Sequence, residues 1–441
     1  MYDLKPARVY ALADVLNDEL SLRRMERMLA AMGLNREDVS VFEPAHLPAV
    51  VEDLFEAWSP EEVLSGQEGC FRRPLIFTRI RIEEEPPELD ELLQACPEGT
   101  AKSQLLHALG FIELVRHSHP REDDWEKDYV CWPTMDFGTM IGCPHGCQYC
   151  GHGKSGRFIA VGVNLEEYMQ RVVAPTVEEN QWQRCFRMIG WGADHICWEP
   201  EYDCMRPFLQ TLAERDRYGY FHSTSENVDW IAELPHRDRL IAIWSTTCET
   251  VAREIEPGSG RAVGRIEAAR RLQQMGIPVR FKFKPMIPIR GWREEYAQII
   301  EQMLALTEPE SIGFCVIMWN TMASLEQKID LKLLEPEYVQ AARDAADELE
   351  GVITGPFPHE VRAEVYRYLI EQVRRWDEQV PLYISTESRE MWDEMAGELG
   401  QRPETFFCGC SSVALPGRTL AVSKDCPHST YRRLQEEPAE A

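Results

Sequence analysis

From Phe137 to Trp319, short apolar runs rich in β-branched and aromatic residues alternate with amphipathic stretches of helical period. Because parallel strands need a crossover connection, this alternation predicts a parallel sheet with outer helices. The six expected strands lie at 137–142, 185–192, 218–225, 240–247, 279–287 and 311–319. Six strand–helix units favour an open, partial (β/α)6 barrel, whose functional loops follow the C-terminal ends of the strands.

The segments on either side of this region follow other patterns. Before it, a predicted helix at 21–33 lies among strand-like runs at 7–12, 39–43 and 73–82. After Asn320 the chain is mainly helical, with one more strand-like run at 380–385. The predicted class is therefore α/β, with three parts: an N-terminal α/β unit (1–131), the partial barrel (132–322) and a mainly helical, cysteine-bearing C-terminal region (323–441).

The chain is strongly acidic, with 74 Asp and Glu against 47 Lys and Arg and a net charge of −27. Nucleic-acid binding normally needs a basic surface, so duplex DNA is an unexpected partner. The sequence shows neither a secretory signal nor an apolar run of the roughly 18–20 residues that cross a bilayer, which predicts a cytoplasmic protein without membrane contact. In that reducing compartment, the 14 cysteines suggest metal ligands or buried small side chains instead of disulfides.

Three cysteines, Cys143, Cys147 and Cys150, lie in a glycine-rich loop after the first expected barrel strand. Thiolates select soft metals, so zinc and an iron–sulfur cluster are both open. Structural zinc prefers four ligands, and only His145 or His152 could complete a local zinc site. A cubane takes one ligand per iron, so three thiolates would leave one iron free. The loop therefore favours a 4Fe–4S cluster, and a zinc-stabilised binding protein without catalysis is the alternative.

The spacing Cys-x3-Cys-x2-Cys resembles that of the radical S-adenosylmethionine (SAM) superfamily. The resemblance implies that the free iron chelates SAM and that an electron donor such as flavodoxin or ferredoxin drives its cleavage. The 5′-deoxyadenosyl radical then abstracts hydrogen from a substrate. The resemblance places Tyr149, the aromatic residue before the third cysteine, near the adenine. We also assign to the SAM site three residues at the C-terminal ends of the second and third expected strands: Gly190, Gly192 and Ser225.

A closer resemblance, to the spore photoproduct lyase branch, covers roughly residues 5–400, with "GCPHGCQYC" as its sharpest element. It implies that Ser245, in "IAIWSTT", contacts SAM. Two features depart from the branch: Gly151 stands where the lyase has a tyrosine of its hydrogen relay, and Cys197 matches the catalytic cysteine only with a gap. We therefore expect a paralogue that acts on a small molecule, nucleoside or peptide. Lyase-type DNA repair is an alternative.

A second group of thiols, Cys408, Cys410 and Cys426, lies near the C-terminus in a polar, turn-rich segment. These thiols predict an auxiliary iron–sulfur cluster, with His428 or Cys131 as a possible fourth ligand. Such a cluster could relay electrons, anchor substrate or donate sulfide for sulfur insertion. Zinc or a redox pair is the alternative.

Charged residues alternate on the fifth expected strand, where Arg280, Lys282 and Lys284 share one face. Pointing into the barrel, they would suit a carboxylate or a phosphate. Pointing outward, they would only be solvated.

Overall fold

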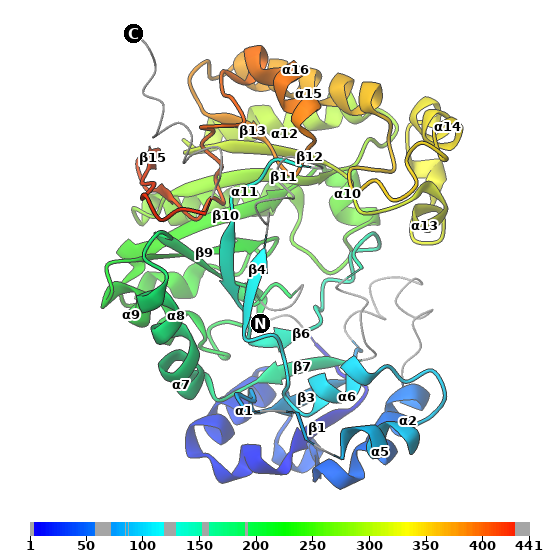
Figure 1. Cartoon of the computed structure of the whole chain (residues 1–441), viewed down its shortest axis with the longest axis vertical. Helices are drawn as coiled ribbons and strands as arrows, with labels where there is room; N and C mark the ends of the chain where they lie inside the picture. The colour runs from blue at the N-terminus through cyan, green and yellow to red at the C-terminus, as the bar shows by residue number, and fades with distance from the viewer. Residues whose placement is uncertain are drawn as a thin grey trace.

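The barrel region is an eight-stranded sheet in the order β13-β12-β11-β10-β9-β8-β5-β4 (Figure 1). The computed structural model describes residues 4–57, 72–83, 85–86, 88–118, 129–151, 158–189 and 193–427. All neighbours from β5 to β13 pair in parallel, and β4 pairs antiparallel to β5. The strands are β4 (Val115–Ser118), β5 (Thr134–Phe137), β8 (Cys185–Met188), β9 (Tyr218–Ser223), β10 (Leu240–Thr246), β11 (Val279–Met286), β12 (Ile312–Val316) and β13 (Leu382–Ile384).

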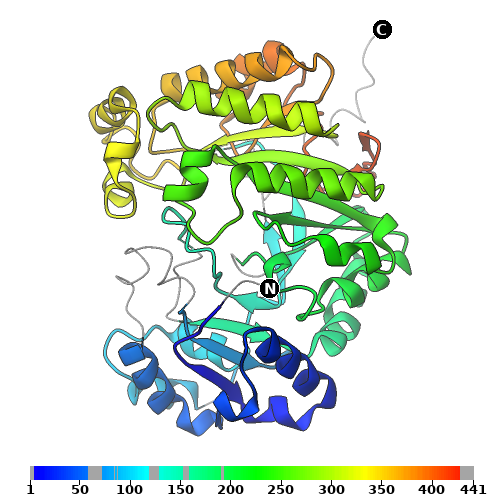
Figure 2. The same cartoon turned by 180° about the vertical axis from the view of Figure 1, so that it is seen from behind.

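Helices cover the outer face of this sheet, as the view from behind shows (Figure 2). Helix α9 contacts β9, α11 contacts β10 and β11, and α15 contacts β12. Sequences such as "AVGRIEAARRLQQ" consist largely of strong helix formers with apolar residues on one face. The outer helices are α7 (Leu165–Tyr168), α8 (Ala174–Glu179), α9 (Met205–Ala213), α10 (Glu249–Glu254), α11 (Ala262–Gln274), α12 (Trp292–Leu306), α15 (His359–Arg374) and α16 (Arg389–Leu399).

The predicted α/β class and the open, partial barrel are confirmed, because β4 and β13 remain as two separate edges of the sheet. Two details differ from the expected six strands. The run at 137–142 divides between β5 and β6 (Met140–Ile141), and β6 belongs to another sheet. The strand-like run at 380–385 contributes β13, which extends the parallel sheet by one strand. Both differences depend on which strands pair with one another, which periodicity does not reveal.

The second sheet has the order β2-β1-β3-β7-β6. The edge strand β6 pairs antiparallel with its neighbour β7 (Ile159–Gly162), and the cysteine loop connects them. The loop therefore leaves from, and returns to, the sheet built mainly by the N-terminal residues. The other elements here are β1 (Val9–Leu12), β2 (Ser40–Phe42), β3 (Leu75–Thr78), α1 (Glu19–Ala31), α2 (Leu47–Ala57), α5 (Leu89–Gln94) and α6 (Lys102–Ala108).

The C-terminal chain returns to the barrel after α13 (Met322–Glu326) and α14 (Pro336–Asp344). Its last described part, which includes β14 (Ala414–Leu415) and β15 (Thr419–Leu420), lies beside the barrel strands (Figure 1). Here Arg280 of β11 donates to the carbonyl of Gly409, and Tyr220 of β9 donates to that of Cys410.

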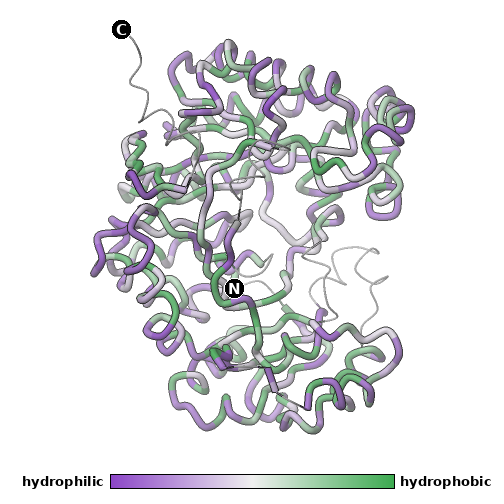
Figure 3. Tube along the Cα trace, viewed as in Figure 1, coloured by the Kyte–Doolittle hydropathy of each residue, from purple (hydrophilic) through white to green (hydrophobic). Residues whose placement is uncertain are grey.

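One hydrophobic core extends through both sheets. Hydrophobic segments of the trace gather in the interior, and hydrophilic and hydrophobic residues alternate along the outer helices (Figure 3). Within the described residues, no helix is long and apolar enough to cross a membrane.

Candidate active site

The cysteine loop begins at Gly142 and brings three thiols close enough to influence one another. Cys143 is buried, and Cys147 and Cys150 are partly exposed. Burial raises the pKa of the Cys143 thiol to about 12, although backbone N–H groups of Asp194 and His145 donate to its sulfur and oppose the rise. Burial also raises the pKa of Cys147, and the other two thiols add to that rise. N–H groups directed at a cysteine sulfur are contacts that an iron–sulfur cluster uses.

Two glycines set the path of the loop. Gly142 and Gly146 have φ angles of +86° and +62°, a region that side chains rarely adopt. At Gly142 a Cβ atom would also lie 3.0 Å from the carbonyl oxygen of Phe158. The tight turns thus follow from the absence of a side chain at these two positions.

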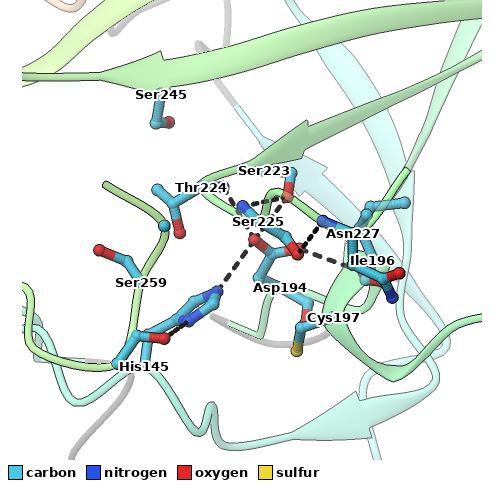
Figure 4. A network of polar contacts seen from close by, with 12 residues as sticks. His145, Asp194, Ile196, Cys197, Ser223, Thr224, Ser225, Asn227, Ser245 and Ser259 are labelled. Atoms are coloured by element: carbon cyan, nitrogen blue, oxygen red, sulfur yellow. Dashed lines mark hydrogen bonds and ion pairs between the residues drawn. The ribbon is translucent and has the colours of Figure 1, made fainter. Parts of the chain in front are cut away.

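His145 is held by hydrogen bonds at both ring nitrogens (Figure 4). Nδ1 lies 2.7 Å from the carbonyl oxygen of Gly258, and Nε2 lies 3.0 Å from Asp194 Oδ2. A ring that uses both nitrogens in this way offers none to zinc. His152, the other local candidate, lies outside the described residues. Within those residues, no three His, Cys, Asp or Glu side chains gather as ligands of a single ion.

Asp194 is the buried centre of this polar network, which joins the cysteine loop to the ends of two barrel strands (Figure 4). Its Oδ2 accepts hydrogen bonds from Ser223 Oγ at 2.7 Å and from the Thr224 N–H at 2.9 Å, besides the contact with His145. Its Oδ1 accepts from the Ile196 N–H at 3.1 Å. Burial alone would raise the pKa of Asp194, but His145 and these donors hold it below its ordinary value.

A second network joins Tyr149 to β10. The Tyr149 hydroxyl donates to Glu256 Oε1 at 2.7 Å, and Arg265 Nη2 donates to Oε2 of the same carboxylate at 2.5 Å. Arg265 Nη1 donates to the carbonyl of Ser245 at 2.9 Å. The structure thus connects Tyr149 and Ser245, the two residues whose SAM contacts the family resemblance implied. The half-buried Ser245 side chain points toward the side of β10 where the Asp194 network lies (Figure 4).

Sequence reasoning missed Glu256 and Arg265, both of which are buried. The available signal was the segment "EPGSGR", a glycine-rich turn that follows β10 and precedes α11. This segment holds the cysteine loop through its backbone. The N–H of Gln148 donates to the carbonyl of Ile255 at 2.9 Å, and that of Gly258 donates to the carbonyl of His145 at 2.8 Å.

Two other predicted site residues that the structure describes, Cys197 and Ser225, are buried and form hydrogen bonds within the protein. Cys197 is buried after β8, and its thiol donates to the carbonyl of Asp194 at 2.9 Å. Burial raises the pKa of this thiol, and Asp194 and the Cys143 thiol add to the rise. Ser225 is also buried, and its hydroxyl accepts from the N–H of Asn227. The roles of both remain predictions. Gly190 and Gly192 lie outside the described residues.

Glu199 belongs to an acidic and aromatic segment after β8. Burial raises its pKa to about 7, and its carboxylate accepts from the N–H groups of Asp203, Cys204 and Met205 at the start of α9. Its present contacts therefore cap a helix.

Among the C-terminal thiols, Cys408 and Cys410 lie side by side, with 3.2 Å between their sulfur atoms. Lys282 Nζ donates to the Cys410 sulfur at 3.2 Å, and Cys131 is close enough for its thiol to influence both. Cys426 is buried. Two predicted ligands and the suggested fourth ligand Cys131 are therefore neighbours, and the second cluster stays a prediction.

Comparison with known proteins places these features in a family context. A sequence model of the family "Spore photoproduct lyase" matches residues 134–329, which include the cysteine loop, Asp194, Ser245 and Glu256. No curated protein sequence matches the chain.

Two solved structures of spore photoproduct lyase show the same fold. A variant with bound AdoMet and dinucleoside spore photoproduct is 14% identical, with a TM-score of 0.57 over 88% of this chain and 100% of that one. A second structure, complexed with dinucleoside spore photoproduct, is 14% identical, with a TM-score of 0.57 over 87% and 99%. Residues 134–329 therefore match the spore photoproduct lyase family model, and the chain has the fold of those enzymes and resembles their branch of the radical SAM superfamily.

Proposed function

We propose that the chain is a radical SAM enzyme in which Cys143, Cys147 and Cys150 ligate a 4Fe–4S cluster. The observation that carries the proposal is the loop itself: three mutually interacting thiols, with N–H donors at Cys143, held at the C-terminal edge of a partial barrel. When bound, the cluster and SAM supply reductive cleavage to a 5′-deoxyadenosyl radical.

The surrounding residues position this site. Asp194 and His145 fix the loop against the ends of β8 and β9. Glu256 and Arg265 fix the Tyr149 ring relative to Ser245, so that the ring can lie against the adenine and the Ser245 hydroxyl can bind a polar group of SAM. All these residues act by binding or orientation, and an electron donor such as flavodoxin or ferredoxin would supply the electron that SAM cleavage requires.

The proposed substrate is a small molecule, a nucleoside or a peptide. Two observations support this choice over duplex DNA: the net charge of −27 and the exposed Gly151, which offers no side chain for a hydrogen relay. Sulfur insertion depends on the second cluster and stays a prediction with it.

The test replaces Cys143, Cys147 and Cys150 by alanine, singly and together. After anaerobic reconstitution, the wild-type site should hold about four irons and form 5′-deoxyadenosine from SAM, and each variant should lose both properties. Cys96→Ala, which removes another partly exposed thiol, is the matched control and should behave as wild type. Normal SAM cleavage by the triple variant would contradict the proposal.

A further inference from the structure

The three cations of β11 face inward. Arg280 Nη1 donates to the carbonyl of Gly409 at 2.7 Å, and Lys282 Nζ donates to the Cys410 sulfur. Both contacts are with the C-terminal segment, on the face of the sheet opposite α11 and α12. Because side chains two residues apart on a strand share a face, Lys284 points to the same side. Of the two orientations that the sequence left open for these three side chains, the structure shows the one that points into the barrel.

Arg280 and Lys282 have partners that balance their charges. Arg280 forms an ion pair with Glu310 at 2.8 Å. Lys282 Nζ lies 3.2 Å from the sulfur of Cys410. The hydrogen bond with Cys408, together with Lys282 and His222, holds the pKa of this thiol well below its ordinary value. On β8, Arg187 forms an ion pair with the buried Asp136 of β5.

Within the part of the chain that the structure describes, Lys284 has no such partner. Its Nζ lies 3.4 Å from the Thr386 hydroxyl and 4.7 Å from the centre of the Trp319 ring. Among the described residues, no carboxylate lies within ion-pair distance of it, and the ionisable groups that influence it most are thiols and Lys282. Partial removal of an ammonium group from water without a counter-charge is costly, and burial indeed lowers the pKa of Lys284. Although the sequence is strongly acidic, the carboxylates of the described part of the chain leave this cation without an ion pair.

The position of Lys284 makes it accessible to a ligand. It lies near the C-terminal end of β11, at the edge where parallel barrels bind their substrates. Its side chain is partly exposed, and Trp319, which follows β12, is 53% exposed. Thr386 follows β13, so three neighbouring strand ends contribute to this cluster.

We propose that Lys284 binds an anionic group of the substrate, a phosphate or a carboxylate. The Thr386 hydroxyl donates a second hydrogen bond to the anion, and the Trp319 ring covers one side of it. This inference rests on the proposed function, because the anion is part of a substrate only if the chain is the enzyme proposed above. The anion supplies the negative charge that no described carboxylate places beside Lys284.

The first test measures how fast each lysine of the reconstituted full-length protein reacts with trace acetic anhydride, read by mass spectrometry. Inorganic phosphate, pyrophosphate, succinate and SAM are the probes. Either the two phosphate compounds or succinate should slow the acetylation of Lys284 several-fold, and the effect should saturate. Protection by phosphate and pyrophosphate would identify the bound anion as a phosphate, and protection by succinate would identify it as a carboxylate. The exposed Lys332 is the internal control and should react equally with and without them.

The second test uses Lys284→Met, which keeps an unbranched chain beneath Trp319. Wild-type tryptophan fluorescence should change on titration with the protecting anion, and this variant should lose the response while Lys332→Met keeps it. Absence of protection by phosphate, pyrophosphate and succinate would overturn the proposal. Protection by SAM alone would also overturn it, because the anion would then be the methionine carboxylate. 5′-Deoxyadenosine formation, measured on the same preparations, reports separately on the proposed function.

Discussion

Tyr149 and Arg265 bind the same carboxylate: Glu256 accepts from the tyrosine at 2.7 Å and from the arginine at 2.5 Å. One end of this bridge lies in the cysteine loop and the other on α11, whose Arg265 also binds the backbone of β10. The loop is thereby tied to the barrel through a buried ion pair, and breaking the pair should affect both stability and SAM binding.

Arg265→Met should lower the free energy of unfolding by about 3–5 kcal/mol, because Glu256 would keep a buried and uncompensated charge. Urea denaturation measures this change. Arg270→Met removes a more exposed ion pair with Glu267 and should cost less than about 1 kcal/mol. Equal losses in the two variants would show that the buried bridge contributes nothing special.

Asp194→Asn should change how stability depends on pH. The folded-state pKa of Asp194 lies below its ordinary value of 3.8, so its ionised form stabilises the fold above that pH, and the contribution is lost as the pH falls through the folded pKa. Between neutral pH and pH 3.8, the variant should therefore be less stable than wild type by a constant amount. Below pH 3.8 the gap should narrow, and unfolding curves across this range measure it. Curves that stay parallel would contradict this assignment.

Gly258→Ala should disturb the cysteine loop. The added Cβ would lie 2.6 Å from the carbonyl oxygen and 2.8 Å from the Cα of His145, and backbone atoms cannot move aside cheaply. We expect a marked loss of reconstituted iron, measured against Gly397→Ala. No atom lies within 4 Å of a Cβ at Gly397 in α16, and alanine there should be neutral or stabilise the helix by up to about 1 kcal/mol. Equal iron contents in the two variants would argue against the role of Gly258.

If the predicted second cluster forms, iron and sulfide should approach about eight per chain after reconstitution. Alanine at Cys408, Cys410 and Cys426 should then halve the count. A cluster also requires Cys408 and Cys410 to move apart from their present 3.2 Å. About four irons in both proteins would show that the C-terminal thiols bind no cluster.

Repair of an oligonucleotide that contains spore photoproduct should be absent, or far slower than repair by a true lyase. The acidic chain repels the phosphate backbone, and Gly151 cannot relay hydrogen. Chromatography of the digested oligonucleotide measures the repair. Turnover at the lyase's rate would show that the chain keeps the lyase's substrate.

The sequence predicted those features that depend on local pattern. The alternation of strands and helices revealed the parallel sheet, and the spacing of Cys143, Cys147 and Cys150 revealed the loop. The bond between Tyr149 and Glu256 joins residues 107 positions apart, and no periodicity encodes such a contact. Likewise, alternation put Lys282 and Lys284 on one face, but only the packed C-terminal segment showed that this face points inward. What escaped prediction was the tertiary pairing of residues whose types alone carry no strong signal.

The hairpin of β6 and β7 links the N-terminal strands to the cysteine loop. A chain that began at residue 132 would retain all three loop cysteines, but β7 would lose β3, its parallel neighbour from Leu75 to Thr78. The N–H and C=O groups along that side would become unpaired, and an unpaired strand edge invites mispairing or aggregation. If the first 131 residues were exchanged for those of a relative, β3, which pairs with β7 next to the cysteine loop, would be replaced as well. The N-terminal strands and the hairpin that carries the cysteine loop thus form a single folding unit, because they belong to one sheet.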